Sequence, residues 1–232
     1  MRVAALADVH GNAPALEAVL REVEADLVVF CGDLTWGPLP RETLELVRPL
    51  NARFVRGNSE RELVERTLDW PRARWIRAQH ERLELPRYEE HVVVEVDGLG
   101  RTRFVHGSPR SDEECVTVET PEERVREFMR GVEERVVVTA HTHVRYNRQV
   151  AGVRLLNPGS VGLPYEGETG VAFWAVLGPD VELRRTEYDR EGALERMRAT
   201  GMPQFELIEQ LMTAPPPPAE VIAAAEERVF AG

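Results

Sequence analysis

Short apolar runs recur along this chain, and each is followed within three residues by a polar residue of a type that binds metal ions. The length of the runs, and their valine, leucine, phenylalanine and alanine content, are typical of buried strands. Helical periodicity at residues 15–23 and 42–50, after the first two runs, indicates βαβ units with parallel strands. The runs cover residues 3–7, 27–31, 54–55, 104–105 and 136–138.

The residues that follow these runs form one set of aspartate, asparagine and histidine side chains. Residues at the carboxyl ends of neighbouring strands in an open α/β sheet converge on one crevice. We therefore expect these side chains to meet in space, although they lie far apart in the sequence. Carboxylate, amide and imidazole groups together suit two borderline divalent cations. The set consists of Asp8, His10, Asp33, Asn58, His106, His141 and His143.

Each of these residues has an ordinary explanation when it is taken alone. Asp8 could cap the following helix, and Asp33 and Asn58 follow glycines, as residues in turns commonly do. A single histidine after a strand is more often a surface or core residue than a ligand. Four of the six histidines belong to this one set, however, whereas His80 and His91 lie outside it and are interpreted as structural. The combination favours a metal site.

The order of these groups is Asp-x-His, Gly-Asp, Gly-Asn, His-Gly and His-x-His, and it resembles that of the calcineurin-like metallophosphoesterase superfamily. It is most similar to the small bacterial and archaeal phosphodiesterase branch with the GNxE form. The resemblance covers residues 1–188, and the turn at residues 157–162 adds an independent match. It implies an α/β fold of two packed mixed β-sheets flanked by helices, a four-layer αββα sandwich.

The resemblance also implies that the set binds two divalent metal ions. Asp8, His10 and His143 are expected to bind the first metal. The two carboxylate oxygens of Asp33 allow this residue to bridge both metals. Mixed ligands of this kind suit manganese, iron, zinc, nickel or cobalt, so the identity of the ions stays open.

The second metal is expected to bind Asn58, His106 and His141, again by resemblance. Of the whole set, we predict that Asp33, Asn58 and His106 act in catalysis. The expected reaction is the hydrolysis of phosphodiester or phosphoanhydride bonds by a hydroxide that bridges the metals. A dinucleoside polyphosphate (Ap4A-type) hydrolase and a phosphomonoesterase are alternatives, because their substrates present the same reacting centre. A non-catalytic metal-binding scaffold is an alternative of a different class.

One position departs from the pattern of many superfamily members. Ser59 occupies the place after the Gly-Asn asparagine where many relatives have a histidine that assists the leaving group. This change favours leaving groups that depart without an imidazole acid. Guanidinium groups bind phosphate well, and Arg110 and Arg56 lie next to the motifs, so we predict that they contact the substrate. Asn12 and Tyr165 are further candidates for the cleft.

The second half of the sequence predicts antiparallel hairpins at residues 92–105, 145–156 and 172–188. Residues 59–83 are predicted to form helices outside the sheet that wall the cleft. We divide the chain into a metallophosphoesterase domain, residues 1–188, and a helical C-terminal extension, residues 189–232. In the extension, residues 215–218 are four prolines that predict a stiff spacer, and residues 219–230 predict a short helix. The extension could pack on the domain or form a homo-oligomer.

The composition limits the classes of partner. The formal net charge of −11 argues against a basic nucleic-acid-binding surface but allows a small phosphorylated substrate, because bound metal reverses the local field. Two cysteines, of which Cys31 lies in an apolar run, indicate no disulfide framework. No apolar run is long enough for a membrane span or a signal peptide. We therefore expect a cytoplasmic protein.

Overall fold

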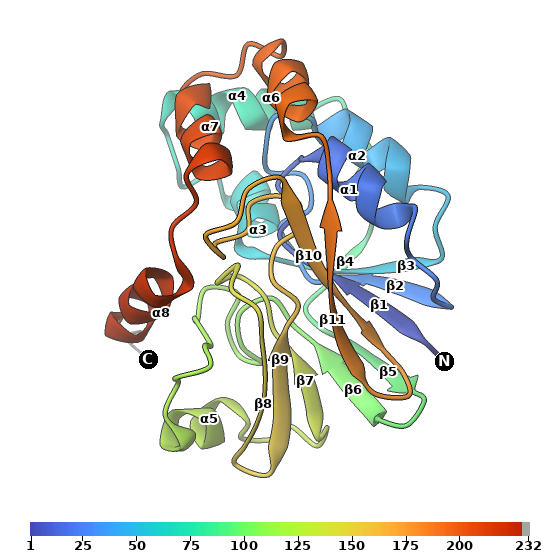
Figure 1. Ribbon diagram of the computed structural model, residues 1–232. Helices are drawn as coiled ribbons and strands as arrows, with labels where there is room; N and C mark the ends of the chain where they lie inside the picture. Colours follow the sequence, from blue (N-terminus) through green and yellow to red (C-terminus); the bar gives the residue numbers. More distant parts are fainter. Residues whose placement is uncertain (229–232) are drawn as a thin grey trace.

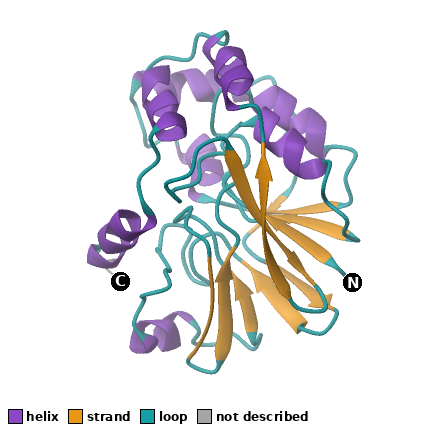
Figure 2. Cartoon of the chain, in the orientation of Figure 1, coloured by secondary structure: helices purple, strands orange, loops and turns teal. Residues whose placement is uncertain are grey.

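The computed structural model describes residues 1–228, which form two β-sheets packed face to face between layers of helices (Figures 1 and 2). Strands of both sheets contribute to one central hydrophobic core, which contains Val29 and Ala175 from the first sheet and Phe104 and Leu156 from the second. The predicted four-layer αββα sandwich is therefore confirmed. None of the helices within this part of the chain is long and apolar enough to cross a membrane.

The first sheet has six strands in the order β11-β10-β1-β2-β3-β4. Strands β1 to β4 are parallel, as the βαβ pattern predicts, and β10 pairs antiparallel with β1. The short edge strand β4 had no clear signal in the sequence. The bounds are β1 (Val3–Leu6), β2 (Leu27–Phe30), β3 (Ala52–Val55), β4 (Tyr88–Glu89), β10 (Val171–Leu177) and β11 (Val181–Glu187).

The second sheet has five strands in the order β5-β6-β7-β9-β8. The three predicted hairpins are present, but the hairpin of β10 and β11 belongs to the first sheet. In the second sheet β6, β7 and β9 run parallel to one another, so both sheets are mixed. The bounds are β5 (Val92–Val96), β6 (Gly100–Phe104), β7 (Val136–Val138), β8 (Tyr146–Val150) and β9 (Val153–Asn157).

Helices cover the outer face of each sheet. Helices α1 (Ala13–Leu20) and α2 (Pro40–Val47) pack on the first sheet, where Leu16 and Leu44 share a cluster with Phe30 and Trp174. Helix α5 (Glu122–Phe128) packs on the second sheet through Val125 and Phe128. The apolar stripes of these amphipathic helices account for the two outer layers.

Residues 59–83 form two helices, as expected: α3 (Asn58–Glu65) and α4 (Pro71–His80). His80 is buried, and its two ring nitrogens lie 2.7 Å from the Ile76 carbonyl oxygen and 2.9 Å from the Thr35 hydroxyl oxygen. These contacts agree with a structural role for this histidine.

Three helices follow β11: α6 (Arg190–Arg198), α7 (Phe205–Thr213) and α8 (Pro218–Glu227). Met197 of α6 and Phe205 of α7 share a hydrophobic cluster with residues of α1 and α4, so these helices pack on the α/β core. Pro218 is the first residue of α8 and not part of the spacer, because proline is tolerated in the first helical turn. Residue 230, the predicted end of the last helix, lies outside the described residues.

Two glycines allow the loops after β2 and β3 to approach each other closely. A Cβ atom on Gly32 would lie 2.4 Å from Nδ1 of His106, and one on Gly57 would lie 2.2 Å from Oδ1 of Asp33. Gly32 also has a φ of +91°, which other residues rarely adopt. A side chain at either of these glycines, in Gly-Asp or Gly-Asn, would therefore collide with a residue of the site at this edge of the sheet.

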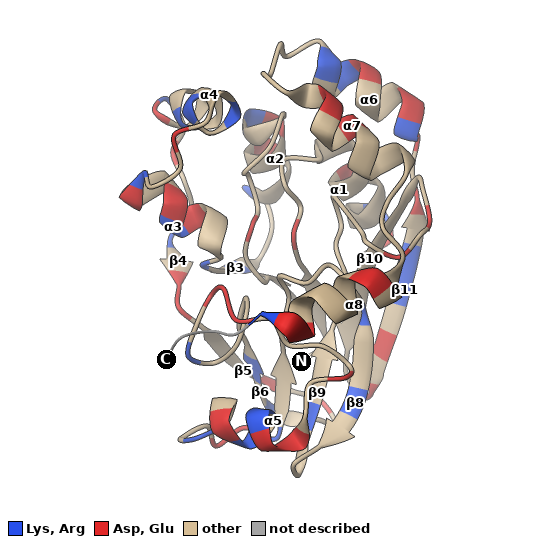
Figure 3. Ribbon diagram, turned by 90° about the vertical axis from the view of Figure 1, so that its left-hand side faces the viewer, with Lys and Arg blue, Asp and Glu red and all other residues tan. Residues whose placement is uncertain are grey.

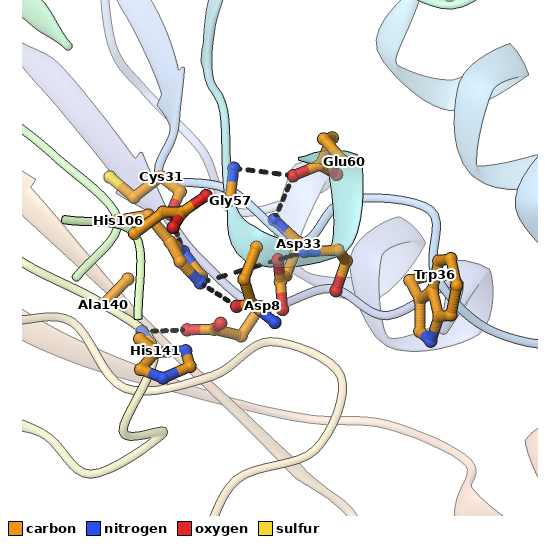
Figure 4. Close-up of polar contacts among 12 residues, drawn as sticks. Asp8, Cys31, Asp33, Trp36, Gly57, Glu60, His106, Ala140 and His141 are labelled. Carbon is orange, nitrogen blue, oxygen red and sulfur yellow. Dashed lines mark hydrogen bonds and ion pairs between the residues drawn. The ribbon is translucent and has the colours of Figure 1, made fainter. Parts of the chain in front are cut away.

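The buried carboxylate of Glu60 joins the same two loops (Figure 4). One of its oxygens accepts hydrogen bonds from the backbone N–H groups of Asp33 at 2.9 Å and Gly57 at 2.8 Å. The other oxygen accepts from the N–H of Leu34 at 2.9 Å. Burial, followed by the negative charge of Asp33, raises the pKa of Glu60 to about 7, whereas the three N–H donors favour its carboxylate form.

We predict that Glu60→Gln lowers the free energy of unfolding by about 1–3 kcal/mol, because the amide NH₂ would leave a buried N–H group without an acceptor. Denaturant unfolding of the metal-free protein measures this loss. Glu65→Gln is the control, since Glu65 lies on the same helix but forms an exposed ion pair with Arg61 and should change stability little. Equal effects of the two substitutions would contradict the proposed role of Glu60.

Candidate metal centre

The seven predicted ligands meet at the carboxyl ends of strands from both sheets. Asp8 and Asp33 follow β1 and β2, Asn58 begins α3 just after β3, and His106 follows β6. His141 and His143 come from the loop after β7. The two carboxylates and His106 are buried, whereas His141 is partly exposed on the floor of a cavity. Figure 4 shows how Asp8, Asp33, His106 and His141 converge.

The backbone at most of these ligands is in the left-handed region, which residues other than glycine rarely adopt. Such strained conformations persist only where the surrounding structure enforces them, and they cluster at functional sites. Five of the seven ligands have φ values between +48° and +67°: Asp8, His10, Asp33, His141 and His143.

The first group consists of Asp8, His10 and His143. The Nε2 atoms of the two histidines lie only 3.1 Å apart. The Nδ1–H of His10 donates to the Trp36 carbonyl at 3.3 Å, and the Nδ1–H of His143 donates to the Leu163 carbonyl at 2.6 Å. When both rings are neutral, their Nε2 lone pairs therefore face each other, and a positive charge, a proton or a metal ion, must lie between them.

Asp8 adds a negative charge to this group. Its Oδ1 atom lies 3.4 Å from Nε2 of His143 and is buried with no hydrogen-bond partner among residues 1–228. The other oxygen, Oδ2, accepts from the backbone N–H of His141 at 3.2 Å. A buried oxygen without a donor is costly, and a cation bound beside Oδ1 would remove this cost.

The second group surrounds His106. Its Nε2 atom lies 2.9 Å from the Asn58 side-chain oxygen and 3.5 Å from Oδ1 of Asp33, and its Nδ1 lies 2.8 Å from the Cys31 carbonyl oxygen. The ring of His141 has its centre 5.0 Å from that of His106. Carbonyl partners on Nδ1 fix the tautomer and leave Nε2 free for a metal, as is usual at metal sites.

Asp33 lies between the two groups. Its Oδ1 atom faces His106, whereas its Oδ2 atom lies 3.6 Å from Nε2 of His10. The backbone N–H of Ser59 donates to Oδ1 at 3.0 Å and orients the carboxylate. The side chains therefore fit divalent metal ions: ligand atoms within 4.8 Å of one another come from Asp8, His10 and His143, and also from Asp8, Asp33 and His106.

The carboxylates of the site are held in their charged form. Burial alone would raise the pKa of Asp8 and of Asp33. Burial is the largest single influence at each group, but the histidines and hydrogen bonds around it together outweigh burial, with His143 foremost at Asp8 and His106 foremost at Asp33. Both pKa values therefore lie below the usual range. Both groups are therefore negative at neutral pH and attract cations.

The imidazoles divide into two kinds. Burial lowers the pKa of His10, and burial together with the charge of His106 lowers the pKa of His141 to about 4. Burial also acts on His106 and His143, but the carboxylates beside them raise their pKa above the usual value. His10 and His141 are thus neutral ligands at pH 7, and the positions of His106 and His143 favour bound positive charge.

A cavity of about 610 Å³ opens directly onto this centre. Asp33, Asn58, His10, His141 and His143 form one end of it. Ser59 and Tyr165 also line the cavity, and the ring of Tyr165 stacks on that of His143 with centres 4.5 Å apart. Tyr165 is thus in the cleft, as the sequence suggested. Asn12 instead caps α1 and donates to the Gly162 carbonyl at 2.9 Å.

The two predicted substrate arginines lie around a different, smaller cavity of about 260 Å³, which also reaches His106. The Arg110 guanidinium is paired with Glu114 and Glu127, and that of Arg56 lies 3.9 Å from Glu90. Their contact with a substrate stays a prediction.

The large cavity is lined instead by Arg72 of α4, which sequence analysis did not single out. Its guanidinium forms no ion pair within residues 1–228 and lies over the Trp70 ring at 5.8 Å. The only signal in the sequence was its place in an arginine-rich helical segment expected to wall the cleft, and several arginines share that signal.

Comparison with solved structures shows close relatives of this fold. A metallophosphoesterase from Sphaerobacter thermophilus has a TM-score of 0.72 and 27% sequence identity, covering 91% of this chain and 98% of that chain. A hypothetical protein from Pyrococcus horikoshii OT3 has a TM-score of 0.71 and 21% identity, covering 91% and 97%. At 21% identity, the similarity to the Pyrococcus protein shows only that the fold is shared.

Sequence comparisons also find relatives that match most of the chain. An uncharacterized protein of Methanocaldococcus jannaschii is 25% identical, over 88% of this chain and 94% of that protein. The model of the calcineurin-like phosphoesterase superfamily domain matches residues 1–177 of the 232. The chain therefore belongs to the calcineurin-like phosphoesterase superfamily, and it is a metal-dependent phosphoesterase.

Proposed function

We propose that the protein hydrolyses phosphodiester or phosphoanhydride bonds with the help of two divalent metal ions. The observation that carries this proposal is the position of Asp33, whose two oxygens face histidines of two separate ligand groups. One carboxylate of this kind can hold two cations at the distance typical of dinuclear hydrolases. Bound there, the ions would supply an acidified water as nucleophile and offset the charge of the phosphoryl group.

The protein supplies position and charge. Asp8, His10 and His143 would hold one ion, with the Trp36 and Leu163 carbonyls orienting the imidazoles. Asn58, His106 and His141 would hold the other. Asp33 joins the two groups, and Glu60 fixes the loops from which Asp33 and Asn58 project. Manganese, iron, zinc, nickel and cobalt all suit these ligands.

Arg72 is the best-placed arginine for the substrate phosphate. It lines the same cavity as the ligands and forms no ion pair within the described chain, although the charge of Glu206 acts on it, whereas Arg56 and Arg110 are both paired with carboxylates. A free guanidinium can donate two parallel hydrogen bonds to a phosphate. A cytoplasmic location, and a homo-oligomer formed through residues 189–232, stay expectations from the sequence.

Leaving-group assistance by an imidazole is not evident at the open side of the centre. Ser59 lines the cavity at the position of the histidine found in many relatives. His141, which also lines it, is neutral at pH 7 because its pKa is lowered to about 4. A neutral imidazole is a poor general acid.

We therefore expect higher kcat/KM for bis(p-nitrophenyl) phosphate than for an unactivated monoester such as glycerol phosphate, because nitrophenolate leaves without a proton donor. Both esters would be assayed with the same metal and at the same pH. A clearly higher kcat/KM for glycerol phosphate would show that the site supplies an acid and that this account of Ser59 is wrong.

We predict that Asp33→Asn lowers turnover by roughly 100-fold or more, since changing even the partners of metal ligands commonly costs 10–100-fold. The fold should survive, because the substitution relieves repulsion between Asp33 and Asp8 in the metal-free protein. Metal content, melting temperature and hydrolysis would be measured on one preparation. Asp97→Asn, at an exposed ion pair with the N-terminus, is the control. Wild-type rates from Asp33→Asn would place the chemistry elsewhere.

A further inference from the structure

The wall of the large cavity that faces the metal centre is built by the end of the chain. We call residues 205–228 the C-terminal strap: helix α7, the extended proline-rich linker and helix α8 (Figures 1 and 3). Its side chains in the cavity wall are mostly apolar. They are Ile208, Leu211, Pro216, Glu220, Val221, Ala224, Ala225 and Arg228.

The strap is held in place by contacts that lie away from the metal ligands. The Glu226 carboxylate accepts hydrogen bonds from the hydroxyls of Thr117 and Thr120, each at 2.6 Å. Arg124 lies 3.5 Å from the same carboxylate, and Ile222 of α8 is buried. These partners lie before and within α5, the helix that packs on the second sheet. Helix α8 is therefore attached to that side of the molecule, where it forms one wall of the cavity.

The rest of the wall continues this apolar surface. Trp36 and Leu163 lie next to the ligand loops, Leu68 and Ile76 come from the region of α3 and α4, and Met202 precedes α7. The cavity lining therefore combines the metal ligands with a largely apolar wall, in which Arg72, Glu220 and Arg228 are charged. Its volume suits a ligand of drug-like size that buries most of its surface.

We propose that the substrate is a phosphoric ester that carries a large apolar group, and that this group packs against the C-terminal strap. The inference rests on the proposed function, because the phosphoryl group is assigned to the metal centre. A sugar or other hydroxyl-rich group would leave polar atoms without partners against leucine, isoleucine and methionine side chains.

The test compares two esters with the same leaving group, methyl p-nitrophenyl phosphate and hexyl p-nitrophenyl phosphate. Burial of the extra methylene groups should raise kcat/KM for the hexyl ester by roughly tenfold or more. In parallel, calorimetry measures binding of hexylphosphonate and methylphosphonate to the metal-loaded protein. Hexylphosphonate should bind more tightly by a similar factor.

Two pairs of variants locate the effect on the strap. Ala224→Asp places a charge in the cavity wall, whereas Ala223→Asp is its control, because Ala223 is equally exposed on α8 but lies outside that wall. Leu211→Gln and Leu207→Gln form a second pair on α7: of these two leucines only Leu211, which is half-buried, lines the cavity, whereas Leu207 is exposed. The cavity variants should abolish the preference for the hexyl ester over the methyl ester. The control variants should keep the preference.

The results separate this inference from the proposed function. Absence of turnover with both esters would contradict the proposed function, and the phosphonate affinities would still decide whether the strap binds apolar groups. Equal affinity for both phosphonates, or equal effects of Ala224→Asp and Ala223→Asp, would overturn the inference. If Ala224→Asp lowers the melting temperature strongly, the α7 pair decides.

Discussion

The site depends on the burial of negative charge and nitrogen lone pairs at one edge of two sheets. Asp8 and Asp33 are both buried and both ionised, and the Nε2 atoms of His10 and His143 face each other at 3.1 Å. Such an arrangement is unfavourable unless positive charge lies within it. The family membership and the geometry therefore point to the same requirement for bound divalent cations.

The fold provides the rigidity that this arrangement needs. Glycines at positions 32 and 57 let two loops touch, and the Glu60 carboxylate joins them through three backbone N–H groups. Carbonyls of Cys31, Trp36 and Leu163 orient three of the imidazoles. Five ligands also have left-handed backbone, which persists only where the surrounding structure enforces it.

Much of the fold and the ligand set could be predicted from the sequence, because both depend on local patterns. Apolar runs that end at Asp8, Asp33 and His106 identify buried strands and the edge at which they finish. The edge strand β4 and the pairing of β10 with β1 could not be predicted, since they depend on contacts between distant segments. For the same reason, the positions of Arg72 and of the C-terminal strap in the cavity wall could not be predicted. No sequence pattern shows which cavity a helical arginine or alanine lines.

The most direct test of the central claim is anomalous scattering at the manganese edge from crystals grown with manganese. The account predicts two peaks, one among Asp8, His10 and His143 and the other among Asn58, His106 and His141, with the Asp33 carboxylate between them. A single peak, or two peaks with Asp33 several ångströms from either, would contradict the two-metal centre.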